Sequence, residues 1–213
     1  MKLPTRPNRL HAVIWFLIIS VSIYYIQAKC FRYFVFTPKN YHEDFFWPRR
    51  NTLFIHIVSG IIATVVSPFQ FISYIRNNYT RLHRIIGKTY IYSIVVSSIT
   101  SFYLCATTPE NIYYALGLTG FTAAWLFTAI MGVITVRKGL IEQHKAWMVR
   151  CFVVTIGFSI SRLLEDILIH MNAGGTRVER LTVLSWVSWI VPLIITEFVL
   201  QKIKIKKYRL IPV

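Results

Sequence analysis

The sequence predicts an all-α polytopic membrane protein, a bundle of six transmembrane helices with both termini in the cytoplasm. Hydrophobic residues make up 55% of the 213 residues, and the mean hydropathy is +0.52. They form repeated apolar runs of about 20 residues, which is the length that crosses a bilayer. The chain also has 24 Lys and Arg against 8 Asp and Glu. These cations gather in alternate connections between the runs, as cytoplasmic loops do.

The six predicted helices follow one another along a single integral membrane domain, residues 1–213, which we place in a bacterial cytoplasmic (inner) membrane. A basic start before the first run is also typical of a signal peptide. Gln27-Ala28-Lys29-Cys30 lacks the small residues of a cleavage site, however, so we predict an uncleaved helix. A basic tail, residues 202–213, ends the chain. The predicted helices are residues 11–28, 51–75, 89–107, 112–136, 146–169 and 181–201.

The outer loop between the first two helices, residues 30–50, is rich in Phe, Tyr and Trp. Such a loop either lies against the lipid headgroups and caps the bundle, or forms a lid over a site. Pro68 is expected to bend the second helix. Cys30 and Cys105 both lie at outer helix ends, where one disulfide is conceivable, although we favour unpaired thiols.

Four histidines fall into two pairs by depth. His56 and His170 lie near the outer face, and His83 and His144 lie at the inner boundary. Two imidazoles from different helices are what bis-histidine ligation of b-type haem requires. One or two haems are therefore expected, with the lipid bilayer and a redox protein as partners. The alternative for each histidine is a hydrogen-bonded packing residue.

Charged residues accompany both histidine pairs. Arg162, Glu165 and Asp166 share one broad face of the fifth predicted helix, and ionisable groups inside a membrane point to function. They would form a proton or ion path, or Arg162 would hold a haem propionate; the alternative is an ion cluster that fixes packing. Arg84 and Arg150 flank the inner histidines and would hold propionates, an anionic electron donor or anionic lipid.

Small residues line two helix faces. Positions 56, 60, 63, 67 and 70 share one side of the second helix and end in Gln70, and a similar stripe runs from Gly117 to Thr135 on the fourth. Small side chains let a flat ring or another helix approach closely. The expected cofactor-binding residues are His56, Gln70, His83, Arg84, His144, Arg150, Arg162 and His170.

Several short motifs between residues 52 and 200 resemble an uncharacterised family of bacterial membrane proteins, domain-of-unknown-function family 2306. They are His56-x-x-x-Gly60, Ser67-Pro68-Phe69-Gln70, His83-Arg84-x-x-Gly87-Lys88-x-Tyr90, Trp125, His144-Lys145-x-Trp147-Met148-x-Arg150 and Arg162. The resemblance implies a multi-helix membrane domain without an established activity. The layout is also similar to cytochrome b561-type di-haem carriers. It differs from them because the fourth helix has no histidine and the fifth has two.

Three functions are compatible with these features. The first is transfer of electrons through b-type haem, which would make the protein a membrane oxidoreductase. The second is transport of a small solute or proton by the cluster from Arg162 to Asp166. The third is a non-catalytic subunit that packs into a larger membrane complex through its small-residue faces. We expect no nucleic-acid partner, because the cations lie between apolar runs rather than along one exposed face.

Overall fold

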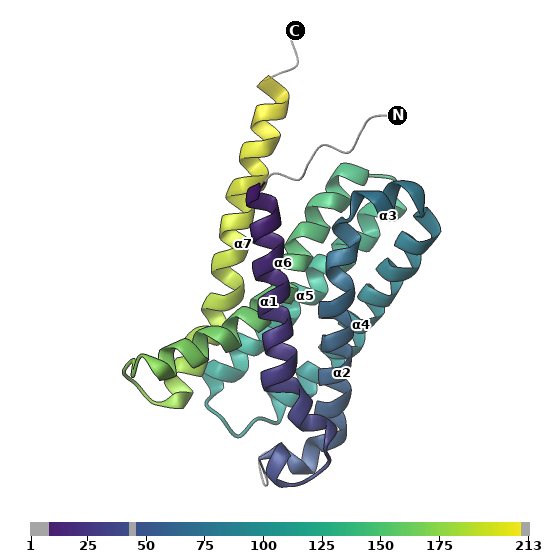
Figure 1. Cartoon of the computed structure of the whole chain (residues 1–213). Coiled ribbons are helices and arrows are strands. Elements are labelled where there is room, and N and C mark those ends of the chain that lie inside the picture. The colour runs from purple at the N-terminus through teal and green to yellow at the C-terminus, as the bar shows by residue number, and fades with distance from the viewer. Residues whose placement is uncertain (1–8, 43–45, 210–213) are drawn as a thin grey trace.

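The computed structural model describes residues 9–42 and 46–209, and this part of the chain is all-α, without a strand (Figure 1). The predicted all-α class is therefore confirmed. The α-helices are α1 (Arg9–Tyr25), α2 (Arg50–Val66), α3 (Ser73–Asn78), α4 (Thr80–Ala106), α5 (Ile112–Arg137), α6 (Ile141–His170) and α7 (Arg177–Arg209). Short helical turns connect them: the π-helix η1 (Ile26–Cys30) and the 3-10 turns η2 (Phe31–Phe34), η3 (Lys39–Tyr41), η4 (Trp47–Arg49) and η5 (Ser67–Phe71).

The long helices run up and down, so that the start of α1 and the end of α7 lie at the same end of the bundle (Figure 1). We call this the terminal end; it also holds α3 and the turn between α5 and α6. The opposite end, which we call the loop end, holds residues 30–42, 46–49, 107–111 and 171–176. His83 and His144 thus lie toward the terminal end, and His56 and His170 toward the loop end.

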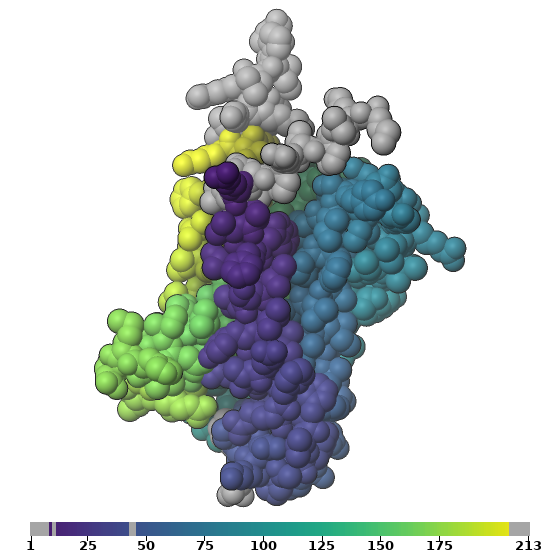
Figure 2. All heavy atoms as spheres, in the orientation of Figure 1, coloured from purple at the N-terminus to yellow at the C-terminus, as the bar shows by residue number. Residues whose placement is uncertain are grey.

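Helix α6 is the centre of the bundle and packs against α5, α7 and α1, while α2 packs against α4. Helix α1 lies across the front of the molecule, between α7 and α2 (Figure 2). Glycines allow the closest approaches. A Cβ on Gly117 would lie 2.0 Å from the Ser185 Oγ, and one on Gly157 would lie 2.5 Å from the Ser188 carbonyl oxygen. Gly117 belongs to the stripe of small residues predicted on the fourth helix, and it lets α7 approach α5 closely.

Within the residues that the structure describes, five helical stretches are long and apolar enough to cross a membrane, and the chain is an integral membrane protein. Helix α6 is not among the five, although it has 30 residues. It carries Arg162, Glu165 and Asp166, and much of it is buried against its neighbours. A sixth span and cytoplasmic termini stay predictions. The five stretches are Ala12–Phe34, Trp47–Phe71, Thr80–Ala106, Ile112–Arg137 and Arg177–Lys204.

The predicted bounds differ most from the structure in the second and third helices; the fifth also begins earlier, at Ile141, and the sixth continues to Arg209. The second, predicted to end at residue 75, changes at Ser67 to the 3-10 turn η5, which contains Pro68. The chain becomes extended at Ile72, with ψ 106°. Proline has no N–H to continue the helical hydrogen bonds, which accounts for the change. The third, predicted from residue 89, begins at Thr80, because a helix continues through polar residues beyond the apolar window.

Candidate functional site

A cavity of about 580 Å³ lies in the loop-end half of the bundle. Its walls come from α2, α4, α5, α6 and α7, and residues between Tyr25 and Phe46 complete them. Trp125 and Thr155 line its deepest part, toward the middle of α5 and α6. The volume is within the range of small-molecule sites, about 300–1,000 Å³. This cavity is the candidate functional site.

His56 contributes an imidazole to the cavity, and the ring is held by α4. Its Nδ1 lies 3.0 Å from the Ser97 carbonyl oxygen, 3.2 Å from the Ser97 Oγ and 3.4 Å from the Thr100 Oγ1. A carbonyl oxygen can only accept, so Nδ1 carries the proton. In the neutral ring Nε2 is then the free acceptor or metal-binding atom.

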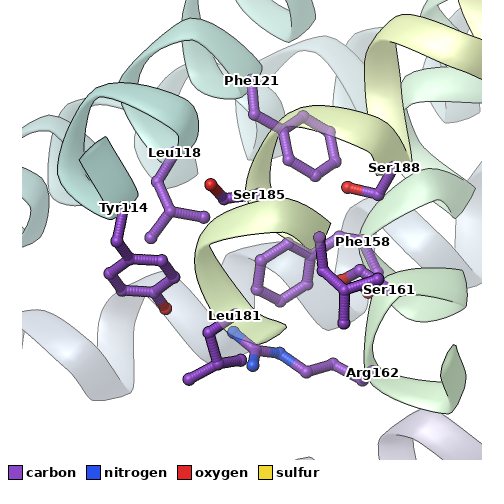
Figure 3. A pocket seen from close by; sticks show the side chains of 10 residues that line it. Tyr114, Leu118, Phe121, Phe158, Ser161, Arg162, Leu181, Ser185 and Ser188 are labelled. Carbon is purple, nitrogen blue, oxygen red and sulfur yellow. Dashed lines mark hydrogen bonds between the residues drawn. The ribbon is translucent and has the colours of Figure 1, made fainter. Parts of the chain in front are cut away.

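Arg162 also lines the cavity, and its guanidinium is held from three sides. Nη1 donates to the Glu165 carboxylate over 3.0 Å, and the guanidinium lies 5.1 Å from the centre of the Phe158 ring. The Tyr114 hydroxyl points toward the guanidinium (Figure 3). A smaller void of about 10 Å³, shown in Figure 3, adjoins the same groups. Glu165 is buried, and its other oxygen lies 3.8 Å from the Arg177 Nε.

Asp166 belongs to a different ion pair from Arg162. It lies 2.6 Å from the Lys29 Nζ and accepts a hydrogen bond from the Tyr24 hydroxyl, so it binds the end of the first helix. The three charged residues predicted as one cluster therefore belong to two separate ion pairs. Arg162 with Glu165 is held within α6, whereas Asp166 joins α6 to the first helix. The side chains of Arg162, Glu165 and Asp166 all belong to residues that line the cavity.

The aromatic loop contributes directly to the cavity wall. The π-helix η1 carries Lys29 and Cys30 into the wall, and Tyr33 and His42 follow. Tyr41 anchors the loop, since its side chain is fully buried and its hydroxyl donates to the Tyr33 carbonyl over 2.6 Å. The loop thus covers the cavity, as a lid would. Cys30, Cys105 and Cys151 are free thiols.

His42 is the second histidine of the cavity, and the sequence analysis did not select it. Partial burial, together with the nearby cations Arg32 and Arg177, lowers the pKa of His42 below its usual value. The ring is therefore neutral at pH 7. The sequence did contain an indication of His42, because this histidine lies in the loop of residues 30–50, for which a lid over a site was one of the two interpretations.

His170, predicted as the outer partner of His56, is not among the residues that line the cavity with His56. It is exposed in the last turn of α6, and it is absent from the cavity wall. Its Nδ1 lies 2.9 Å from the Asp166 carbonyl oxygen of its own helix. The physical reason is its position: the helix ends at His170, beyond the level at which the bundle closes, next to the turn of residues 171–176.

The terminal-end histidines lie near one another, close enough for charges on the two rings to interact. The His144 Nδ1 lies 2.8 Å from the Gly132 carbonyl oxygen. The His83 Nδ1 is buried without a hydrogen-bond partner, and Gln70 donates to the His83 backbone carbonyl over 3.5 Å. Gln70 thus positions the backbone at His83. Neither histidine lines either of the two cavities described above.

The two cations predicted beside the inner histidines differ in their surroundings. Arg150 is bound to Glu197 of α7, with Nε 3.0 Å from the carboxylate, and it stacks 4.7 Å from the centre of the Trp147 ring. Its charge is therefore already paired. Arg84 is exposed, and its charge lies near enough to His83 to act on it. The predicted roles of Arg84 and Arg150 beside the inner histidines stay predictions.

A buried polar network in the middle of the bundle was also not selected from the sequence. The Tyr90 hydroxyl lies 2.5 Å from the Thr155 Oγ1 and 3.4 Å from the Cys151 Sγ, and the Trp125 Nε1 donates to the same Thr155 oxygen over 2.9 Å. Tyr90 and Trp125 occurred only as parts of the motifs quoted above. The network joins α4, α5 and α6, and its members Trp125 and Thr155 line the cavity.

Over residues 9–42 and 46–209, no group of three or more His, Cys, Asp or Glu side chains is arranged to hold a metal ion. The family model described as "Predicted membrane protein (DUF2306)" matches residues 53–200. The chain belongs to this family. The DUF2306 region begins at the start of α2 and ends in α7, so it contains the helices that form most of the cavity wall.

No curated protein and no solved structure matches the chain significantly. The architectural likeness to cytochrome b561-type carriers therefore stays a prediction. Within this DUF2306 protein, α1 and the aromatic loop precede the matched residues. The cavity thus combines a wall from the DUF2306 region with a cover from the segment before it.

Proposed function

We propose that this membrane protein binds a b-type haem in the loop-end cavity and takes part in electron transfer, with His56 as an iron ligand. The observation that carries the proposal is the His56 Nδ1, 3.0 Å from the Ser97 carbonyl oxygen, in a residue that lines a ligand-sized cavity. Axial and metal-binding histidines commonly donate one ring N–H to a carbonyl, which orients the ring and leaves the other nitrogen for the metal.

The cavity wall fits the two chemical parts of a haem. Its aromatic and aliphatic side chains, such as Phe121 and Trp125, suit an apolar ring system. Arg162 lines the cavity, unlike Arg150, and its guanidinium would bind a propionate there in addition to the Glu165 carboxylate, to which Nη1 donates over 3.0 Å. Bound haem would supply one-electron chemistry, and the chain's own residues would hold it and exclude water.

The terminal-end histidines support a second haem site at the other end of the bundle. The His144 Nδ1 is fixed by the Gly132 carbonyl in the same manner as His56 by Ser97. The His83 Nδ1 is buried without a partner, and such atoms ordinarily have one. Arg84 would hold a propionate there. A site toward each membrane face would connect an electron donor on one side, in a bacterial inner membrane, with an acceptor on the other.

The test is the reduced-minus-oxidised absorption spectrum of the full chain, expressed with ample haem and purified in detergent. We expect a Soret band and an α-band after addition of dithionite. His56→Ala should lose the loop-end haem, and the matched control His170→Ala should keep it, because His170 lies outside the cavity. A wild-type chain without haem absorbance would refute the proposal.

A second candidate function is transport of an anion or of protons, and one observation favours it. Arg162, Glu165 and Asp166 all line the cavity instead of facing lipid. Arg162→Gln should then abolish solute flux into vesicles while the protein still runs as a single species on a sizing column. Unchanged flux in that variant would remove this candidate.

The third possibility is a non-catalytic subunit of a larger membrane complex. It relied on small-residue faces as contact surfaces for a partner. Gly117, Gly120 and Gly132 of the fourth-helix face instead lie against Ser185, Trp189 and Met148 of the same chain. This use of the glycines favours the two cavity-based functions over the third.

A further inference from the structure

The cavity is lined by two histidines from different parts of the chain, and only one of them belongs to the DUF2306 region. His56 is in α2, within the matched residues 53–200. His42 is in the loop before them. Haem iron in a membrane electron carrier is commonly held by two imidazoles. The question is therefore which histidine accompanies His56.

The backbone holds His42 in one place although it lies in a loop. It follows η3 directly and has φ 53° and ψ 46°, the left-handed region that a non-glycine residue seldom adopts. Uncommon backbone conformations of this kind tend to occur where a residue has a function. The preceding residue, Tyr41, is fully buried among Cys30, Leu53 and Ile57, which fixes the loop on α2.

Side-chain contacts also position the ring. The centre of the His42 imidazole lies 6.2 Å from the centre of the Phe46 ring, which also lines the cavity. Arg32 braces the same loop, because its Nε donates to the Asn40 carbonyl over 3.1 Å. These contacts fix the loop before and after His42, a residue that is exposed and also lines the cavity.

We infer that His42 is the second iron ligand of the loop-end cavity, in the place that the sequence had assigned to His170. The inference rests on the proposed binding of haem to His56. It means that the ligand set is divided: the DUF2306 region supplies His56, and the covering loop supplies His42. The loop would then be a part of the cofactor site as well as its cover.

The experiment compares the spin state of the reconstituted haem in four full-length chains: wild type, His42→Asn, His170→Asn and His56→Ala. Asparagine suits the His42 backbone, since it tolerates the left-handed region better than most residues. A sizing column checks that each chain is folded. Electron paramagnetic resonance and the Soret position then report whether the iron has two imidazole ligands.

We expect low-spin haem in the wild type and in His170→Asn. In His42→Asn the loop-end haem should stay bound but become high-spin, added imidazole should restore its low-spin signal, and the low-spin signal of a haem held by His83 and His144 should not change. A low-spin spectrum in His42→Asn like that of the wild type would overturn the inference and leave His56 as a ligand. Loss of low-spin haem in His170→Asn would also overturn it. Absence of haem from the wild type would refute the proposed function itself.

Discussion

Lys29 and Asp166 form an ion pair of 2.6 Å that joins the end of the first helix to the centre of the bundle. Lys29 precedes the DUF2306 region and Asp166 lies within it. The Tyr24 hydroxyl donates to the same carboxylate. Because both Lys29 and Asp166 line the cavity, this contact holds the cover on the cavity as well as the helix on the bundle.

Removing the Asp166 charge should loosen the cover. Asp166→Asn weakens two contacts to the first helix, and we expect the population of open molecules to rise by roughly tenfold. Cys30 and Cys105 line the cavity but are only 2% and 7% exposed. Their rate of labelling by N-ethylmaleimide in detergent micelles should rise by the same factor.

Two internal references make the labelling experiment specific. Cys151 is fully buried outside the cavity wall, so its labelling should stay slow. Glu142→Gln weakens an exposed ion pair with Lys145, a kind of contact that contributes little, and should leave all rates unchanged. Equal rates in Asp166→Asn and wild type would show that Asp166 does not hold the cover.

The close approach of α6 and α7 depends on Gly157. A Cβ there would lie 2.5 Å from the Ser188 carbonyl oxygen, which is backbone and cannot rotate away. Gly157→Ala should therefore lower the free energy of unfolding by about 1–3 kcal/mol, the usual cost of overpacking. Thermal unfolding in detergent measures the change.

Gly174→Ala is the matched control, since a Cβ on Gly174 meets nothing within 4 Å. Gly174 lies in the turn between α6 and α7. The variant therefore tests the same substitution at a glycine without a close neighbour. A Gly157→Ala chain that melts at the same temperature as Gly174→Ala would contradict the observed packing of α7.

The Tyr90 hydroxyl should contribute measurably to stability. It is buried between Thr155 and Cys151, and Tyr90→Phe removes both contacts with little change of shape. We expect a loss of about 1 kcal/mol in the free energy of unfolding. Tyr92→Phe changes an exposed side chain two residues away and should have no effect. Equal melting temperatures of the two variants would refute a stabilising role for the network.

The helices and the local ion pair were predictable from sequence, because both depend on neighbours along one helix. Arg162 and Glu165 are three residues apart, a spacing that places them on one face and proved to be an ion pair. Likewise, the alternation of apolar runs and basic turns predicted that His83 and His144 lie at one end and His56 at the other.

The composition of the cavity could not be predicted in the same way. Lys29 and Asp166 are 137 residues apart, and no periodicity links them. The π-helix η1, which carries Lys29 and Cys30 into the wall, has no signature in the apolar pattern. His170 was placed by depth alone, but depth does not determine on which side a residue at a helix end points. His42 needed the folded loop before its position was evident.

The most direct test of the account is the haem content per chain, measured as the pyridine haemochrome of the purified protein. We predict that His56→Ala lacks the loop-end haem and that His170→Ala contains as much haem as the wild type. Its central claim would be contradicted if the wild type, expressed with ample haem, contained none, or if His56→Ala kept the full wild-type amount.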